Sequence, residues 1–72
     1  MKVVPGNLYV IGGYGALVYS RPALNVDRSD AYIIRSSIVM SLGPVVNDFA
    51  FVLADGGLGW VWCGELDRCL AS

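Results

Sequence analysis

Hydrophobic residues along this chain come in short runs that glycine, proline, asparagine and aspartate interrupt. The runs are rich in valine, isoleucine, tyrosine and phenylalanine, which is typical of β-strands bounded by turns. No window of twelve or more residues has the apolar spacing of an amphipathic helix without a glycine or proline inside it. The pattern therefore predicts an all-β protein. The strand-like runs lie at 8–11, 16–20, 31–35, 37–42, 45–54 and 58–63, with a tight helical turn and a last short run within 64–71, and we expect five or six short strands from them.

Turn-forming residues set the expected limits of these strands. Residues 4–7 (VPGN) are typical of a β-turn, and residues 21–30 form the most polar stretch and the longest expected loop. Ser36-Ser37 is expected to be a bend or bulge, and Gly43-Pro44 is expected to end a strand in which Ile38, Met40 and Leu42 share one face. Connections this short favour antiparallel pairing.

Five or six short strands in a chain of this length fit one domain, residues 1–72. An open sheet of short strands leaves its edges unpaired, and a small closed barrel removes them. The expected fold is therefore a small antiparallel β-barrel.

The strands before and after Asp55 are expected to form a hairpin. Asp55-Gly56 and Gly56-Gly57 are both favoured two-residue turns. The first places Leu53 opposite Leu58, and the second places Leu53 opposite Trp60. Either turn places five large side chains on one face: Phe49, Phe51, Leu53, Trp60 and Trp62. The other face is small but also apolar, and holds Ala50, Val52, Ala54 and Val61. Because both faces are apolar, something is expected to cover the outside of the hairpin.

Composition strengthens the expectation of a covered surface. Apolar residues including glycine make up about 63% of the chain, against about 45–50% in ordinary soluble domains, and charged residues only 15%. So small a domain cannot bury that much apolar material inside itself, so we expect protein partners, above all further copies of the chain. The alternative is a monomer with an apolar but tolerable surface. The candidate interface residues are Trp60, Trp62, Val52, Val61, Val3, Val4, Leu24 and Val26.

The sequence offers little for catalysis or for charged ligands. The chain has no histidine, which removes Ser/His/Asp and Cys/His catalysis, and Cys63 and Cys69 lack the spacing and the partners of a zinc site. The glycines at 56–59 precede a strand rather than the helix of a phosphate-binding loop. The net charge is −1 with no basic run, which does not favour nucleic acid. We expect no enzyme activity, catalytic residue, metal, cofactor or small-molecule substrate, and two reduced, half-buried cysteines.

The segment Gly56–Leu66 (GGLGWVWCGEL) resembles the distal-turn motif of SH3-type barrels, in which Gly-x-x-Gly, an aromatic and a β-branched residue precede a short 3₁₀ turn and the last strand. The resemblance implies an SH3-like barrel in which residues 21–30 are the counterpart of the long first loop. Trp62 stands where peptide-binding SH3 domains have a proline, so no polyproline-binding residue is carried over.

The compact layout around this motif is also similar to very small SH3-like proteins encoded by tailed bacteriophages. That similarity implies a non-enzymatic structural subunit of a phage particle, such as a head decoration, tail or connector protein, in contact with copies of itself or with virion neighbours. The alternative is an intracellular SH3-like adaptor for a peptide or regulatory partner. The apolar run 8–19 is too short to span a membrane and no signal peptide is evident, so the expected location is the virion or the host cytoplasm.

Overall fold

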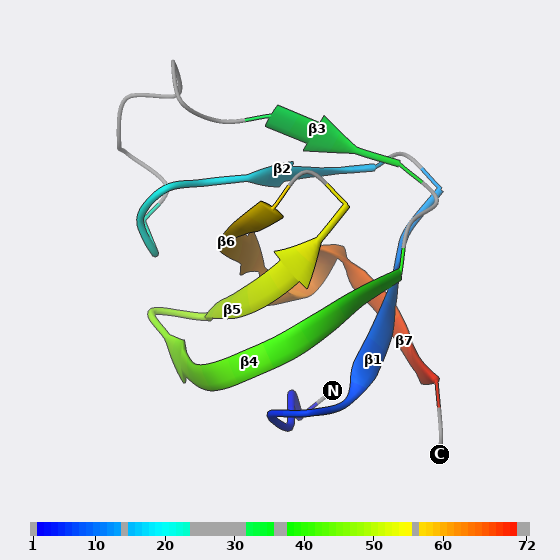
Figure 1. The fold of residues 1–72 in the computed structure, drawn as a ribbon, viewed down its shortest axis with the longest axis horizontal. Coiled ribbons are helices and arrows are strands. Elements are labelled where there is room, and N and C mark those ends of the chain that lie inside the picture. Colours follow the sequence, from blue (N-terminus) through cyan, green and yellow to red (C-terminus); the bar gives the residue numbers. More distant parts are fainter. Residues whose placement is uncertain (1, 14, 24–31, 36–37, 56, 71–72) are drawn as a thin grey trace.

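A computed structural model describes residues 2–13, 15–23, 32–35, 38–55 and 57–70. Within these ranges the protein is a compact all-β domain with seven short antiparallel strands, where the sequence predicted five or six (Figure 1). Within the described ranges the one helical element is a 3₁₀ turn at Cys63–Glu65, which confirms the tight turn predicted before the last strand. The strands are β1 (Leu8–Ile11), β2 (Ala16–Val18), β3 (Tyr32–Ile34), β4 (Ile38–Val46), β5 (Phe49–Ala54), β6 (Gly57–Trp62) and β7 (Leu66–Leu70).

The strands form two sheets. Five of them make one antiparallel sheet in the order β6-β5-β4-β1-β7, and β2 and β3 pair with each other. A bridge between Tyr19 and Trp60 joins the end of β2 to β6, through reciprocal backbone hydrogen bonds of 2.7 and 2.8 Å. The Tyr32 hydroxyl on β3 also donates to the Gly57 carbonyl, at 3.5 Å. These contacts attach the β2–β3 hairpin to the β6 edge of the larger sheet (Figure 1).

The β5–β6 hairpin has one of the two predicted registers. Ala54 pairs with Gly57, so two residues separate the paired strands; Asp55 is the first of them, and Gly56 lies outside the described residues. Leu53 faces Leu58 and Phe51 faces Trp60, as the Asp55-Gly56 alternative requires. Gly57 and Gly59 thus lie within β6, paired with Ala54 and Val52 of the hairpin.

The prediction that Gly43-Pro44 ends a strand is wrong. Strand β4 continues to Val46, and its pairing with β5 shifts between Ser41 and Val45. Three residues of β4 stand opposite a single residue of β5 in this interval, which is a bulge. A bulge leaves its extra residues unpaired, so the missing amide hydrogen of Pro44 removes no ladder hydrogen bond. The turn to β5 comes later, at Asn47-Asp48, where both residues have positive φ.

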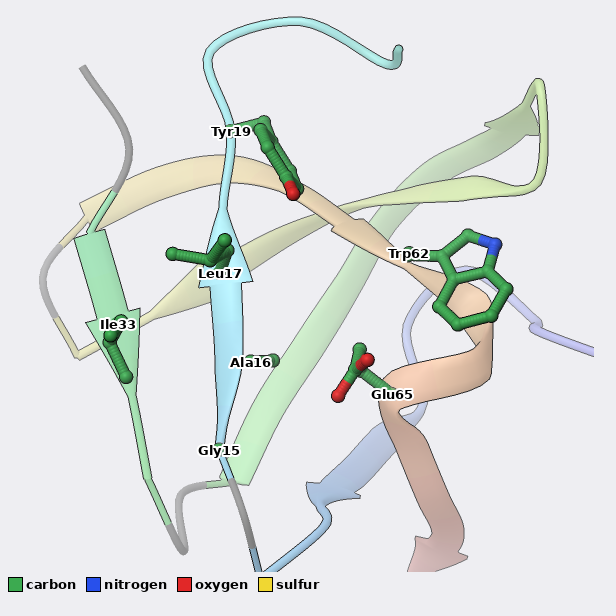
Figure 2. Close-up of a pocket in the computed structure, with 7 residues that line it drawn as sticks. All are labelled: Gly15, Ala16, Leu17, Tyr19, Ile33, Trp62 and Glu65. Atoms are coloured by element: carbon green, nitrogen blue, oxygen red, sulfur yellow. The ribbon is translucent and has the colours of Figure 1, made fainter. Parts of the chain in front are cut away.

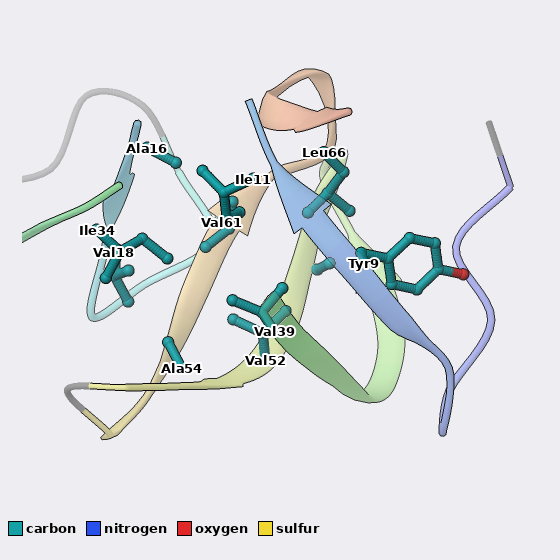
Figure 3. Packing of buried hydrophobic residues seen from close by; sticks show 11 residues of the cluster. Tyr9, Ile11, Ala16, Val18, Ile34, Val39, Val52, Ala54, Val61 and Leu66 are labelled. Atoms are coloured by element: carbon teal, nitrogen blue, oxygen red, sulfur yellow. The ribbon is translucent and has the colours of Figure 1, made fainter. Parts of the chain in front are cut away.

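The core lies on the small face of the hairpin. Ala50, Val52 and Val61 are fully buried, and they pack with Tyr9, Ile11, Val18 and Val39 from β1, β2 and β4 (Figure 3). The interior of so small a domain has room for valine and alanine but not for several indole rings. Most of the large hairpin side chains consequently point outward. Phe49 is the exception, because the Tyr19 ring packs edge-on against it at 5.6 Å between ring centroids.

Candidate functional site

A line of aliphatic side chains crosses the outer face of the five-stranded sheet. Each member stands directly opposite the next on the neighbouring strand, from β7 through β1, β4 and β5 to β6. We call this line the apolar row, and it consists of Leu70, Leu8, Met40, Leu53 and Leu58. Four of the five are exposed, from 36% at Met40 to 60% at Leu58. Every strand of the sheet contributes one side chain to this surface.

The alternation of side chains along each strand fixes the outward direction of the apolar row. The sequence neighbours Tyr9, Val39 and Val52 are at most 1% exposed and point into the core. Successive side chains of a strand point to opposite faces, so Leu8, Met40 and Leu53 must point away from the core. Turning any of them inward would require a one-residue slip of a strand, which would expose a core valine or tyrosine.

Further apolar side chains widen this surface on both sides of the row. Ile38 and Leu42 on β4 are 54% and 41% exposed. Phe51 and Trp60 form a half-buried cross-strand pair with ring centroids 5.0 Å apart. An open groove of about 450 Å³ runs over the face and is lined by Leu8, Ile38, Met40, Leu53, Ala54 and Asp55. Asp55 is the only ionisable group among these lining residues. Small-molecule sites usually have several convergent polar groups, so this groove is better suited to another protein surface.

A second cavity, of about 350 Å³, lies between the β2–β3 hairpin and the end of β6 (Figure 2). Its lining residues are Gly15, Ala16, Leu17, Tyr19, Ile33, Trp62 and Glu65. Trp62 and Glu65 come from β6 and the 3₁₀ turn, and Trp62 is 43% exposed. A Cβ atom at Gly64 would lie only 2.7–2.9 Å from the Trp62 ring, so Gly64 permits the ring to fold back over the turn.

The predicted interface residues lie in different parts of the structure. Val52 and Val61 were named as interface candidates, but both are 0% exposed within the chain, so a partner cannot contact them in the folded state. The core needs small residues, which is why this face of the hairpin is the buried one. Trp60 lies beside the apolar row, whereas Trp62 lines the second cavity.

The remaining candidates lie near the chain start and in the long loop. Val4 is 42% exposed, and its amide donates a 2.7 Å hydrogen bond to the Tyr9 hydroxyl. Val3 is half-buried and packs against the core. Leu24 and Val26 lie outside the described residues, as does the predicted bend at Ser36-Ser37.

Cys63 has the properties of a structural rather than a reactive thiol. Cys63 and Cys69 are unpaired and half-buried. Partial burial, and next the Asp48 carboxylate, raise the pKa of the Cys63 thiol. A raised pKa keeps the thiol protonated at neutral pH, whereas a catalytic cysteine needs a thiolate.

Other side chains offer no metal site or membrane span in the described part of the chain. No group of three or more His, Cys, Asp or Glu residues there could hold a metal ion. No helix in the same residues is long and apolar enough to cross a membrane.

Sequence reasoning missed Leu8, Met40 and Leu58 as surface residues. The shared face of Ile38, Met40 and Leu42 was identified, but nothing assigned it to the outside. Small residues were the available signal: Ser41, Ala50, Ala54 and Gly59 alternate with the large side chains on three adjacent strands, and all four are buried. Comparisons of the chain with protein-family models, with curated proteins and with solved structures each found no match.

Proposed function

We propose that this chain is a non-enzymatic assembly protein that acts through protein–protein contacts made by the apolar row. The observation that carries this proposal is the continuity of the row, in which five aliphatic side chains span all five strands with no polar side chain between them. Single exposed hydrophobic residues are normal on a protein surface, but a contiguous patch is a common mark of an interaction site.

The size of the surface supports the same proposal. From their exposed fractions, the four exposed members of the apolar row together with Ile38 and Leu42 present roughly 500 Å² of surface. A standard protein interface buries about 800 Å² on each partner, and about 65% of a homodimer interface is apolar. The row is therefore large enough to form the centre of such an interface, with the neighbouring polar groups as its rim.

The setting that we propose for this protein rests on the resemblance to SH3-type barrels. The Asp55-Gly56 turn, the 3₁₀ turn at Cys63–Glu65 and the final strand from Leu66 stand at the positions that the resemblance implies. In this proposal the protein is an SH3-like component of a bacteriophage virion, as a head decoration, tail or connector subunit. Its partners are further copies or virion neighbours, and its location is the virion or the host cytoplasm.

The cavity of Figure 2 favours a second candidate function, an intracellular adaptor that binds a peptide. The exposed Trp62 ring and the Glu65 carboxylate border the same space, which would suit a peptide side chain with an apolar stem and a basic end. Only one of the seven lining residues is charged, and polar anchors for a peptide backbone are few. The apolar row is the stronger of the two surfaces.

The size of the native particle in freshly clarified extracts tests the proposal. We expect the wild-type chain to elute from size-exclusion chromatography well above its 7.7 kDa mass. Leu53→Lys, which changes a 46% exposed member of the row, should shift it toward the monomer. Ser20→Lys is the matched control, because Ser20 is exposed and follows β2 outside the row. Wild-type protein that elutes as a monomer in extracts would refute the proposed function.

A further inference from the structure

A second line of side chains runs beside the apolar row and has opposite charges at its two ends. Val10 pairs with Ile38 on one side and with Arg68 on the other. The β4–β5 register places Met40 opposite Leu53. Because the strands are antiparallel, continuing this register by two residues places Ile38 opposite Asp55. Ile38 and Asp55 also line the same groove. The line across the sheet therefore reads Asp55, Ile38, Val10 and Arg68, with one acidic and one basic end.

This arrangement of charges is complementary to itself. Consider a two-fold axis that lies parallel to the strands, between β4 and β1. Rotation about this axis reverses the order of the strands across the sheet, but each residue keeps its position along the strand direction. It brings Arg68 of one copy over Asp55 of the other, and the symmetry forms this pair twice. The same operation sets Met40 over Leu8 and Leu53 over Leu70, so four of the five members of the apolar row face one another, while Leu58 on the edge strand β6 lies beyond the facing sheet.

We infer that the occupant of the apolar row is a second copy of this chain, packed sheet against sheet about this two-fold axis. The inference rests on the proposed function, because it names the partner of the same surface. Two facing sheets pack about 10 Å apart, with their strands within roughly 30° of each other, which suits an axis along the strands. A two-fold contact requires a self-complementary surface, and the charged line and four members of the apolar row meet that requirement.

Charge also fits a second copy better than a strongly charged partner. The chain has a net charge of −1, so two copies repel each other little. Among the described residues, the pairing places Asp55 and Arg68, both exposed, at opposite ends of one line on this face, and the exposed Asp67 lies beside Arg68 at the register shift of β7. A nucleic acid or a strongly basic protein would need a face of one sign. An apolar centre with balanced rim charges is the usual anatomy of a homodimer interface.

Sedimentation equilibrium of the purified chain tests the inference through a charge reversal. We expect wild-type protein to associate reversibly to dimers, and Asp55→Arg or Arg68→Asp alone to raise the dissociation constant by about tenfold, because each replaces two rim attractions with repulsions. The double variant Asp55→Arg/Arg68→Asp should restore wild-type affinity. Arg21→Asp makes the same charge change as Arg68→Asp at an exposed position beyond β2 and should leave the affinity unchanged.

Two outcomes would overturn the inference. Purified protein that stays monomeric up to its solubility limit would exclude a second copy, and a large particle in extracts would then still support the proposed function with a different partner. This two-fold arrangement would be excluded if the single charge reversals left the dissociation constant of the dimer unchanged, or if the double variant did not restore it. Far-ultraviolet circular dichroism of each variant shows whether it is folded, so a lost dimer is not mistaken for a lost fold.

Discussion

The attachment of the β2–β3 hairpin to the sheet depends on the absence of a side chain at Gly59. A Cβ atom there would overlap Cγ1 of Val18 and lie 3.1 Å from the Tyr19 carbonyl oxygen. Val18 is 1% exposed and packed in the core, so its side chain has nowhere to move. We predict that Gly59→Ala pushes β2 away from β6.

The cost of Gly59→Ala can be worked out from these contacts. Overpacking a tight core costs about 1–3 kcal/mol. Moving β2 also weakens the two backbone hydrogen bonds between Tyr19 and Trp60, each worth about 0.5–1.5 kcal/mol. A total loss of about 2–4 kcal/mol is a large share of the stability of a small domain. For a chain of this size, 1 kcal/mol corresponds to about 4–8 °C, so we expect Tm to fall by about 10–30 °C.

Thermal unfolding followed by circular dichroism measures this loss, and two variants test its cause. Gly43→Ala is the matched control in β4: a Cβ atom there meets nothing within 4 Å, so its Tm should stay close to that of the wild type. Val18→Ala removes the methyl group that the new Cβ would overlap, so Gly59→Ala should cost much less in that background. A Gly59→Ala protein as stable as wild type, or a cost that is unchanged in the Val18→Ala background, would refute the reasoning.

Three further predictions concern the core and the Trp62 ring. The buried Ser41 hydroxyl has no hydrogen-bond partner among the described residues. Ser41→Ala should therefore raise the free energy of unfolding, measured by urea titration, by about 1 kcal/mol. A lower free energy of unfolding in the variant would contradict this. Burial, and next Asp48, raise the pKa of Cys63, so the folded state holds this proton more tightly than the unfolded chain. The difference in free energy of unfolding between wild type and Cys63→Ala should thus be independent of pH below about pH 8.5. Above that pH, the wild type should lose stability relative to the variant until the pH passes the raised pKa. A gain in its relative stability with pH would show that the pKa is not raised. Gly64→Ala should displace the Trp62 ring and increase acrylamide quenching in a Trp60→Phe background, and unchanged quenching would show that the ring does not rest on the turn.

The strand pattern could be predicted from the sequence because local turn chemistry controls it. Asp55-Gly56 allows a two-residue hairpin, and the alternation of apolar residues around it then fixes the register. Gly43-Pro44 misled the same reasoning, since proline usually ends strands. A bulge in β4 accommodates it, and a bulge depends on how β5 pairs, which local sequence does not reveal.

The candidate surface was harder to predict because the hairpin is apolar on both faces. Side-chain size determines which face is buried, because Val52 and Val61 fit the narrow interior and most of the large side chains lie on the outer face. The apolar row is also made by pairing between strands far apart in the sequence, such as Leu8 with Leu70. No local pattern shows that these side chains stand in one line, and only the strand order β6-β5-β4-β1-β7 brings them together.

Photo-crosslinking in cells that produce the protein tests the central claim most directly, because it asks whether another protein covers the apolar row. A benzoylphenylalanine residue placed at Leu53 lies within the row, and one placed at Ser20 lies outside it. The account predicts a discrete protein adduct from position 53, with its mass and identity established by mass spectrometry, and little or none from position 20. Equal crosslinking from both positions, or none from position 53, would contradict it.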